Sequence, residues 1–594
     1  MPGILGIISQ SPAEQSSRRI AAMVGAMTHE DFYKSQTCSV SEMGTHAAFV
    51  GFKDSTDGIY SHQGGTTVLV FSGECFVGTA LANGEILTRM YEQEGEGMLE
   101  KLNGLFCGVL IDKDRKKVLL FNDRYGMRRI YFHESDGNFY FASEAKALLR
   151  ILPELREFDP EGVADYLTFG STLDWRTLFR GIEIVPGGSV WTFEGGRCHR
   201  GKYFSPEMWE SRSELGTDEY EKLLPETFRR ILPRYFESDS RTGIALTGGL
   251  DTRMIMACRP QNNGHTTCYT FSGNNGQTQD DKIAARVAAA SNLEHSLLRL
   301  EPDFFSKFPE HVDKTVFATD GCAGVCNAHE TYFNRKAREF APVRLTGNYG
   351  SEILRGISTF KPLYLSPQLL RPNWRPIIQS RPGRLSAGKS HPMTFAAFKE
   401  IPWNLYGNLS AGWSQLQFRT PYLDNELVAL AFQAPAPSRN SSMPSLRVVS
   451  ANNAALCEIP TDRGFANANS GLGFLSRRLF AEVTFKLDYY NNEGFPRALA
   501  PFEPLLKSAS TRLGFVGLHK FLHYRSWLQN EFGPYVRETV AAAKHRLDNF
   551  FDPRFLELMA AEHIEKRRNH SLEINAVLTL AAVERLLFRD LPRD

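Results

Sequence analysis

Six consecutive residues carry the groups needed to hold a phosphate: Thr247-Gly248-Gly249-Leu250-Asp251-Thr252. Two adjacent glycines let the backbone approach an anion closely, and the free N–H groups of a helix starting here would point at it. Thr247 and Thr252 can add hydroxyl donors, and Asp251 can hold Mg²⁺ that bridges phosphates. No lysine follows, so the segment is not a Walker loop. Its residue types and spacing predict a cradle for phosphate groups.

This segment, called the 247–252 loop below, is flanked by elements that can position it. Before it lies an apolar run typical of a buried strand, and after it a helix-compatible run. Strands are predicted at Gly243–Leu246, Thr266–Phe271 and His295–Leu298, and helices at Thr217–Tyr235, Asp251–Cys258 and Asp280–Ala290. Alternating strands and helices favour a parallel sheet covered by helices.

The first 200 residues have a different pattern, with short β-branched or aromatic runs separated by turns. Strands are predicted at Gly3–Ile8, Thr67–Phe71, Gly108–Ile111, Val118–Phe121, Ile130–His133 and Phe139–Ala142. Helices are expected at Arg19–Met27 and Thr79–Gln93, which together with the strands indicate a layered α+β domain. Near the other end of the chain, Phe551–Phe588 has the apolar spacing of helices.

Composition narrows the class of protein. At about 100–200 residues per domain, the 594 residues predict two to four domains. The net charge of +1 argues against nucleic acid as a partner. Nine scattered cysteines form no disulfide framework, and the sequence shows neither a secretory signal nor an apolar run of about 18 residues. We therefore expect a cytoplasmic protein without a membrane partner.

The 247–252 loop resembles the pyrophosphate-binding motif of the asparagine synthetase family, usually SGGxDS, with threonine in place of both serines. Further segments are similar to that family in the same order: Leu102–Phe106, Asn122–Gly126, Phe141–Leu148, Phe179–Ile182, Val185–Gly188 and Arg419–Asp424. The resemblance implies an α/β protein with two domains. Residues 1–205 would form a class II glutamine amidotransferase-like (Ntn-type) sandwich, and residues 206–594 a parallel α/β synthetase domain of the ATP-pyrophosphatase type.

In that family the synthetase half adenylates a carboxylate with ATP and Mg²⁺, and an amine then attacks to give an amide and AMP. Glutamine-using members begin Met-Cys-Gly-Ile, where the cysteine attacks glutamine; Pro2 stands here instead. The glutamine-pocket runs are also altered, to Thr28–Asp31 and Ser72–Val77. We expect a domain that has lost glutamine hydrolysis. The alternative, that Cys75 or Cys107 replaces the nucleophile, conflicts with their apolar, strand-like surroundings.

A second glycine-containing loop, Thr346–Glu352, lies where the family carries an acidic loop. Two alignments are open. Without a gap, Asn348 takes the place of the acid and Ser351 that of the aspartate. With one inserted residue, Tyr349 would help to deprotonate the attacking amine, as in β-lactam synthetases, and Glu352 would hold Mg²⁺. A packing tyrosine beside a turn is the structural alternative.

The resemblance implies further nucleotide-site residues: Leu246, Ser272 and Gly347. Arg463 is the best counterpart of a lysine that stabilises the adenylate, although an ordinary surface arginine explains it nearly as well, and arginine is not equivalent to lysine. Asp280 and Asp281 either lie beside the adenine or only favour a helix N-terminus. The basic, proline-rich insert at about 353–400 is either a surface excursion or a loop over a phosphate site.

Family branches without glutamine hydrolysis include β-lactam synthetases, carbapenam synthetases and lasso peptide cyclases, which use an amine already present on the substrate. We therefore expect an amide-forming ligase whose small-molecule or peptide substrate bears a carboxylate and an amine. A homodimer or a partner maturation enzyme is compatible with such a branch. Ammonia-dependent amidation of aspartate or a uronic acid is the second hypothesis, and a non-catalytic ATP-binding or scaffold protein is the third.

Overall fold

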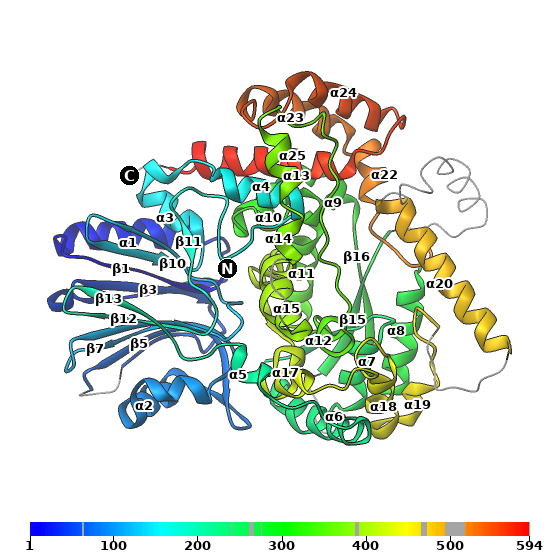
Figure 1. Cartoon of the computed structure of the whole chain (residues 1–594), viewed down its shortest axis with the longest axis horizontal. Coiled ribbons are helices and arrows are strands. Elements are labelled where there is room, and N and C mark those ends of the chain that lie inside the picture. Colours follow the sequence, from blue (N-terminus) through cyan, green and yellow to red (C-terminus); the bar gives the residue numbers. More distant parts are fainter. Residues whose placement is uncertain are drawn as a thin grey trace.

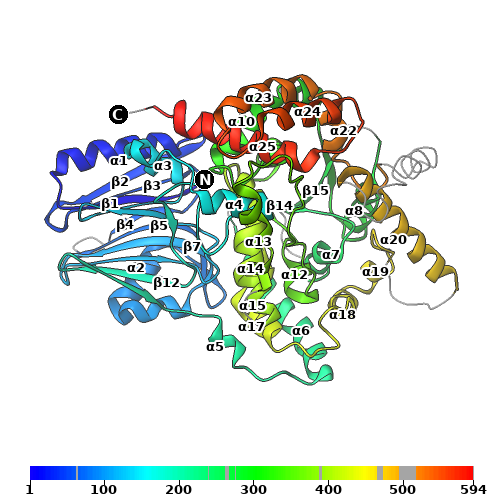
Figure 2. The ribbon, with the colours of Figure 1, turned by 45° about the horizontal axis from the view of Figure 1, so that its top comes forward.

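The computed structural model describes residues 1–61, 65–238, 240–260, 266–274, 276–386, 391–464, 472–493 and 517–592. A two-layered β-sandwich lies beside a helix-covered parallel sheet, and a layer of C-terminal helices spans one edge of both (Figure 1). Figure 2 shows the two layers of the sandwich with α1 (Ala13–Met27) outside one layer and α2 (Gly84–Glu94) outside the other. The predicted α/β class and the two kinds of sheet are therefore confirmed.

The sandwich contains only antiparallel strand pairs. One sheet has the order β11-β9-β10-β1-β3-β2, and the other has the order β13-β12-β8-β7-β5-β4, with β6 paired to β5. The strands are β1 (Gly3–Ile8), β2 (Tyr33–Val40), β3 (Thr45–Phe52), β4 (Gly58–Ser61), β5 (Thr67–Val77), β6 (Ala80–Ala82), β7 (Asn103–Asp112), β8 (Lys117–Asn122), β9 (Tyr131–Ser135), β10 (Asn138–Ala142), β11 (Glu183–Ile184), β12 (Ser189–Glu194) and β13 (Arg197–Lys202).

Side-chain alternation explains why these strands form layers. On β1, Ile4 packs between the sheets, whereas Leu5 and Ile7 belong to the core beneath α1. Neighbouring β3 alternates in the same way, with Phe49 between the sheets and Val50 facing outward. Since successive side chains point to opposite faces, the sheet that contains β1 and β3 needs cover on both of its faces. Helices α1 and α3 (Ala145–Ile151) provide the outer cover.

The third sheet, outside the sandwich, is parallel throughout and has the order β16-β15-β14-β17-β18. Its strands are β14 (Thr242–Ala245), β15 (Thr266–Ser272), β16 (His295–Arg299), β17 (Val343–Leu345) and β18 (Gln417–Arg419). From β14 the chain first proceeds outward through β15 and β16, and then returns to the other side of β14 as β17. Such a reversal opens a crevice at the carboxyl ends of the two central strands.

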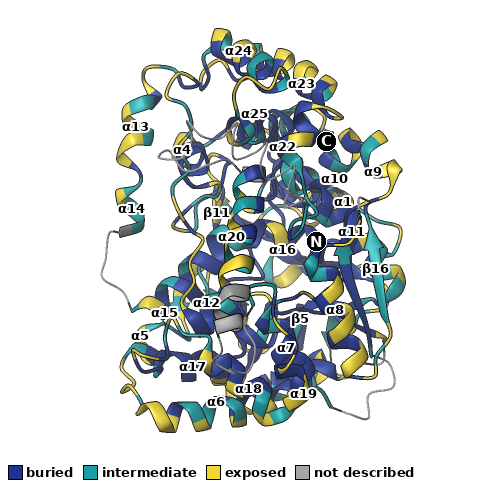
Figure 3. Cartoon of the chain, turned by 90° about the vertical axis from the view of Figure 1, so that its right-hand side faces the viewer, coloured by how far each residue is buried: buried dark blue, intermediate teal, exposed yellow. Residues whose placement is uncertain are grey.

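Helices cover both faces of this sheet. Those that matter for the crevice are α7 (Leu250–Ala257), α8 (Gln279–Ala290), α11 (Ala328–Phe340), α12 (Gly350–Arg355) and α16 (Tyr406–Trp413). The outer helices include α6 (Thr217–Ile231), α17 (Asn425–Phe432), α18 (Met443–Asn452) and α20 (Leu472–Glu493). Figure 3 shows the buried residues concentrated at the centre and exposed residues on outer helices such as α13 (Trp374–Ser380).

The C-terminal layer comprises α22 (Tyr524–Gln529), α23 (Gly533–Arg546), α24 (Pro553–Ile564), α25 (Ser571–Val583) and a π-helical segment, Glu584–Arg589. It packs on α10 (Phe308–Ala318), and its last segment contacts α3 of the sandwich. The predicted helicity of Phe551–Phe588 is confirmed apart from a break between α24 and α25. In the described part of the chain, no helix combines the length and apolarity that a membrane crossing requires.

Two element predictions need correction. The expected helix Thr79–Gln93 starts only at Gly84, where the Asn83 side chain caps it, because Ala80–Ala82 pairs with β5 as a strand. The expected helix Thr217–Tyr235 ends at Ile231 and tightens into a 3₁₀ turn, which begins next to Pro233. Strands β2 and β3 were not predicted, because β2 carries mostly polar residues and β3 is buried on both faces.

Candidate active site

The 247–252 loop connects β14 to α7 at the crevice between β14 and β17. Together with the loop after β17 it lines a cavity of about 470 Å³. Of the residues singled out from the sequence, the cavity is lined by Leu246, Thr247, Gly249, Asp251, Thr252, Asp280, Gly347, Tyr349 and Glu352. The parallel sheet thus unites two segments that lie about 100 residues apart in the chain.

The two loops touch so closely that glycine is required at the contact. A Cβ atom on Gly350 would lie 2.5 Å from Asp251 Cγ, and one on Gly347 would lie 2.8 Å from the Thr252 nitrogen. Larger residues would push the second loop away from the first. The glycines of Thr346–Glu352 therefore serve the packing of the two loops against each other.

Asp251 is held by Arg355, one turn after Glu352 on α12. The guanidinium donates from Nη1 to Asp251 Oδ1 at 2.7 Å and from Nη2 to Oδ2 at 2.8 Å. Ser351 Oγ also donates to Asp251 Oδ2 at 3.2 Å, and Tyr422 donates to the Asp251 carbonyl at 2.7 Å. This forked, charge-assisted geometry neutralises the carboxylate at the loop.

Glu352 shares the cavity with Asp251. Burial, together with the nearby carboxylates of Glu400 and Asp251, raises the pKa of Glu352 to about 7 against the opposing charge of Arg355. Among the described residues no group of three or more His, Cys, Asp or Glu side chains could hold a metal. Two carboxylates beside phosphate oxygens are nevertheless the usual protein contribution to a Mg²⁺ site, so Asp251 and Glu352 fit that ion.

Gly248 belongs to the 247–252 loop but does not line the cavity. Its N–H donates to Asp280 Oδ1 at 2.8 Å, so an internal carboxylate occupies a donor that would otherwise face an anion. Burial and the neighbouring Asp462 raise the pKa of Asp280 to about 7. Asp281 instead caps α8 through Thr278 and accepts from Ser272 Oγ at 2.8 Å. Ser272 is therefore engaged by the start of α8.

Tyr349 combines a strained backbone with an unsatisfied hydroxyl. Its φ of +76° lies in the left-handed region, and its buried Oη has no hydrogen-bond partner among the described residues. Burial raises the pKa of Tyr349 well above its ordinary value, and the charge of Glu352 adds to this. A neutral phenol can donate a hydrogen bond into the cavity. Strain and an orphan hydroxyl at a cavity wall mark a candidate functional residue.

Asn348 and Ser351, from the alternative alignment, also line the cavity. Arg463 does not belong to the described cavity wall; its guanidinium lies 4.9 Å from the ring centre of Phe485 on α20. The segment that follows it, 465–471, lies outside the described residues. This placement does not decide between the two alignments of the second loop, and it does not test a role for Arg463. These assignments stay predictions.

The basic insert makes two different kinds of contact. Arg355 reaches the 247–252 loop, whereas Arg381 and Arg384 pair with acids on or near α4 (Pro160–Phe169). Arg381 Nη2 lies 2.7 Å from Glu161, and Arg384 Nη1 lies 2.9 Å from Asp165. Lys389 lies outside the described residues. Only Arg355 of these arginines thus brings charge to the phosphate loop.

A second group of charged side chains, paired with one another and buried, lies at the start of β1. Glu144 pairs there with the amino group of Met1, with His29 at 2.7 Å and with Lys146 at 2.6 Å. Lys146 also lies 3.0 Å from Asp320, which precedes α11 in the synthetase half. All four side chains are nearly or completely buried. Desolvation by burial lowers the pKa of His29 well below its ordinary value, as the charge of Lys146 also does.

Cys75 and Cys107 are both buried in the sandwich. Burial raises the pKa of the Cys107 thiol to about 12 and raises that of Cys75 further above its ordinary value. A nucleophilic cysteine needs a thiolate, which electropositive, partly exposed sites favour. The two thiols therefore have the surroundings of core residues.

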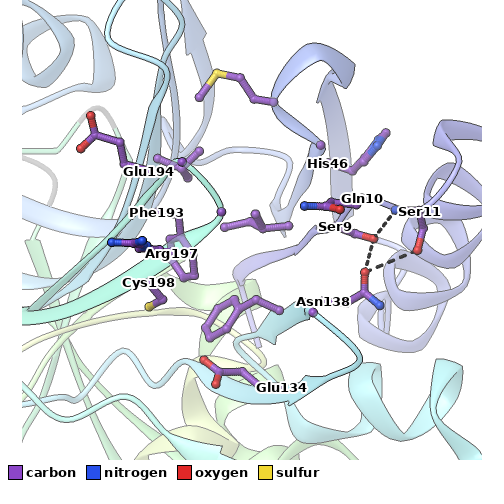
Figure 4. Close-up of a pocket in the computed structure, with 18 of the residues that line it drawn as sticks. Ser9, Gln10, Ser11, His46, Glu134, Asn138, Phe193, Glu194, Arg197 and Cys198 are labelled. Carbon is purple, nitrogen blue, oxygen red and sulfur yellow. Dashed lines mark hydrogen bonds between the residues drawn. The ribbon is translucent and has the colours of Figure 1, made fainter.

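A larger cavity, about 830 Å³, lies at the end of the sandwich where β1 terminates (Figure 4). Hairpin turns at Ser135–Asn138 and Glu194–Arg197 line it, together with Ser9, His46 and Cys198. None of the residues of the 247–252 loop or of the Thr346–Glu352 loop contributes to its wall. The chemistry-bearing motifs thus point to the smaller cavity.

Sequence reasoning missed Arg355 as a partner of the loop, and it missed Arg344, Glu330 and Asn408 on the cavity wall. A signal existed for Arg355, since it follows Glu352 by three residues on a helix and so lies on the same side. For Arg344 the signal was an arginine within an otherwise apolar strand, which is rare without a purpose.

Comparison with known proteins agrees with this geometry. The family described as "Glutamine amidotransferase domain" matches residues 1–204, and the family described as "Asparagine synthase" matches residues 223–445. Asparagine synthetase [glutamine-hydrolyzing] 1 of Bacillus subtilis is 25% identical over 289 residues, covering 48% of this chain and 44% of that protein. A putative asparagine synthetase of Methanocaldococcus jannaschii is 23% identical over 285 residues, covering 46% and 54%.

The match therefore spans about half the length of these relatives. Among solved structures, a glutamine phosphoribosylpyrophosphate amidotransferase from B. subtilis is 12% identical with a TM-score of 0.23, covering 50% of this chain and 65% of that chain. A U34-tRNA thiolase from Methanococcus maripaludis has a TM-score of 0.20 at 12% identity, covering 52% and 85%. These structural similarities are too distant to bear on the chemistry. The two family matches in this order, on an amidotransferase-type sandwich and a parallel synthetase sheet, make this chain a member of the asparagine synthetase family.

Proposed function

We propose that this chain is an ATP-dependent ligase that forms an amide bond without hydrolysing glutamine. It adenylates a carboxylate with release of pyrophosphate and joins the acyl group to an amine carried by a substrate. The observation that carries the proposal is one cavity at the strand-order reversal, lined by the 247–252 loop, Asp251, Glu352 and Tyr349. We also propose residues 1–205 as the non-hydrolysing domain and residues 206–594 as the synthetase domain.

The loop supports the nucleotide half of the reaction. Backbone N–H groups at the start of α7 and the hydroxyls of Thr247 and Thr252 can bind phosphate oxygens. Mg²⁺, when bound by Asp251 and Glu352, would neutralise charge on the phosphates. Arg355 already supplies one positive charge at this point. A carboxylate oxygen attacks the α-phosphate, and the bond to pyrophosphate breaks.

Amide formation then needs an amine beside the adenylate. The C–N bond forms as the acyl C–O bond breaks, AMP leaves with the electron pair, and the amine loses its proton. Tyr349 faces this region as a neutral phenol, so it is suited to donate a hydrogen bond to a developing negative charge. Because Glu352 is assigned to Mg²⁺, the proton of the amine is lost to solvent rather than to this carboxylate.

Two observations favour loss of glutamine hydrolysis. Pro2 offers no side-chain nucleophile, and the groups around the start of β1 are tied into the buried pairs of Glu144 and Lys146. The altered pocket run also has another use: Glu74 accepts from Arg419 Nε at 2.8 Å and from Nη2 at 2.6 Å. Because Arg419 belongs to the synthetase sheet, this pair joins the two halves.

An exchange assay between ATP and labelled pyrophosphate tests the proposal. Carboxylates to be offered are aspartate, a uronic acid, and amino acids with and without a second carboxylate. At least one should support exchange, and Asp251→Asn should reduce it more than about 100-fold, because the loop acid acts at the phosphates. Asp548→Asn is the matched control, since Asp548 is exposed and far along the chain from the loop.

Three further measurements separate the hypotheses. ATP that binds without exchange for any offered carboxylate would support a binding protein and overturn the ligase. Glutaminase activity, measured as glutamate release, should be absent; its presence would contradict the non-hydrolysing assignment. Product formation with ammonium chloride as sole nitrogen source would favour ammonia-dependent amidation.

A further inference from the structure

The wall of the cavity at the 247–252 loop is completed by side chains from other elements. They include Arg344, Glu330, Phe271, Phe418 and Asn408. Arg344 lies on β17, where it stands opposite Gly243 of β14 on one side and Phe418 of β18 on the other. Arg344 is thus a charged residue between the two apolar residues of β17, Val343 and Leu345.

Arg344 lacks a charged partner of its own. Its guanidinium lies 4.7 Å from the ring centre of Phe271 and 4.8 Å from that of Phe418. Nη1 donates to the neutral Asn334 Oδ1 at 2.7 Å, while the buried Nε has no hydrogen-bond partner. Within the described ranges no carboxylate lies within ion-pair distance of Arg344. A largely desolvated cation held by rings and an amide is an attractive site for an anion.

Glu330 supplies the opposite charge on the same wall. It lies in the first turn of α11, and its side chain is 22% exposed. Burial opposes its ionisation, but a hydrogen bond from His329 and the charges of His329 and Arg344 together keep the pKa of Glu330 below its ordinary value. Glu330 is therefore an anion at the cavity.

Asn334 holds the two charges in a fixed arrangement. Its amide oxygen accepts from Arg344, and its Nδ2 donates to Glu330 Oε2 at 3.3 Å and to the Glu330 carbonyl at 2.8 Å. Asn334 itself is completely buried. Because both charged groups are bound to one rigid amide, the pair is preorganised rather than adaptable. We call Arg344, Glu330, Asn334, Phe271 and Phe418 the Arg344–Glu330 subsite.

We propose that the Arg344–Glu330 subsite binds the amine-bearing reactant, and that this reactant also carries an anionic group, as an amino acid does. Arg344 takes the anion, and Glu330 faces the amine in its cationic form. This inference rests on the proposed ligase function and names the class of its second substrate. The activated carboxylate must lie beside the 247–252 loop, which leaves the Arg344–Glu330 subsite for the amine-bearing reactant. Ammonium could pair with Glu330 but would leave the charge of Arg344 uncompensated.

The arrangement also explains why the two charged groups do not pair directly. They are linked through Asn334, and no direct contact between them is formed. A zwitterion can bridge the two charges and repay their desolvation, whereas a single ion would leave one of them uncompensated. The subsite therefore selects against simple amines and against simple carboxylates.

Calorimetric titration of the full chain with small probes tests the proposal. Glycine, β-alanine and 4-aminobutyrate offer a carboxylate and an amine at three separations, whereas ethylamine and propionate each offer only one. At least one zwitterion should bind at least about tenfold more tightly than ethylamine or propionate, since each charged contact contributes a factor of this order. Binding should be measured with and without ATP.

Variants locate the binding. Arg344→Gln should weaken the preferred zwitterion at least about tenfold, Arg344→Lys should restore part of the loss, and Glu330→Gln should weaken it similarly. ATP affinity should change less than about twofold in all three. Arg335→Gln is the control, because Arg335 lies on the same helix but is exposed and pairs with Glu30. Thermal melting of each variant reports whether it folds.

The outcomes separate this inference from the proposed function. Zwitterions that bind no better than ethylamine and propionate, or that bind Arg344→Gln as tightly as the unaltered chain, overturn the subsite. If pyrophosphate exchange proceeds in that case, the ligase function stands and only the subsite fails. Failure of exchange with every carboxylate instead removes the ligase function, whatever the probes do.

Discussion

Charged side chains gather at two strand ends in this molecule, and their surroundings differ. At the start of β1, Glu144, Lys146 and Asp320 form buried pairs, with Lys146 satisfied by acids on both sides. At the end of β14, charges line a cavity of about 470 Å³, and the hydroxyl of Tyr349 and Nε of Arg344 have no described partner. Buried charges that satisfy one another support a structural role. Charges beside unsatisfied groups and open space indicate ligand binding.

The largest expected effect is on the stability that the buried cluster of Glu144, Lys146 and Asp320 contributes. Lys146→Met removes the shared cation and leaves Glu144 and Asp320 without it, so we expect a loss of about 3 kcal/mol of stability. Scanning calorimetry should show the lowered transition. The exposed pair of Arg18 and Glu14 is the control, and Arg18→Met should not change the transition. Unchanged stability of Lys146→Met would mean that the cluster does not fasten the two halves.

The next effect is on metal affinity at Asp251 and Glu352, which line the cavity. Arg355→Met leaves Asp251 and Glu352 without their nearest cation, so the empty site should bind Mn²⁺ about tenfold more tightly. Electron paramagnetic resonance of free Mn²⁺ measures this without turnover. Arg381→Met, which alters a cation bound to α4 instead, is the control. An equal or weaker affinity in Arg355→Met would show that the arginine does not oppose a metal at Asp251.

Stability and ATP affinity are expected to depend on pH through Asp280, which accepts the N–H of Gly248. The folded pKa of Asp280 is raised to about 7, so its contribution to stability is present at low pH and is lost as pH rises through 7. Its carboxylate, with Asp462 and Lys520 nearby, also occupies a loop N–H and repels phosphate once ionised. ATP affinity should therefore fall between pH 6 and pH 8. Asp280→Asn should flatten this dependence; an unchanged pH profile would contradict the role.

The smallest effect is on stability at Tyr349. Because its Oη makes no described hydrogen bond, Tyr349→Phe should leave the free energy of unfolding within about 0.5 kcal/mol of the unaltered chain. Pyrophosphate exchange should also persist within about threefold, since the phenol is proposed to act after adenylation. A loss of more than about 1 kcal/mol would instead show that the hydroxyl of Tyr349 makes a stabilising hydrogen bond in the folded protein.

Much of the fold could be predicted because local patterns and tertiary packing agree. The alternation of Ile4 and Leu5 places β1 between two layers, and the apolar run before Thr247 places β14 at the centre of its sheet. The exceptions have local causes. Both faces of β3 are buried, so its sequence shows no polar–apolar alternation, and Ala80–Ala82 becomes a strand only because β5 is beside it.

The candidate site was predictable in part for a related reason. A strand, a glycine turn and a helix start are contiguous in the chain, so residues 247–252 indicate phosphate binding without further context. Contacts between distant segments were not accessible in this way. Arg355 meets Asp251 across 104 residues, and Glu74 meets Arg419 across 345. Both pairs depend on how the sheets and domains pack.

By itself the sequence determined that this chain has a phosphate-binding loop after a buried strand, and that no cysteine stands at position 2, because these properties reside in contiguous residues. Only the tertiary structure decided which charges compensate one another. It paired Arg355 with Asp251, enclosed Lys146 between two acids, and left Arg344 between two aromatic rings with no counter-ion among the described residues. The reason is physical: the energy of a charge depends on its burial and its neighbours, and packing sets both.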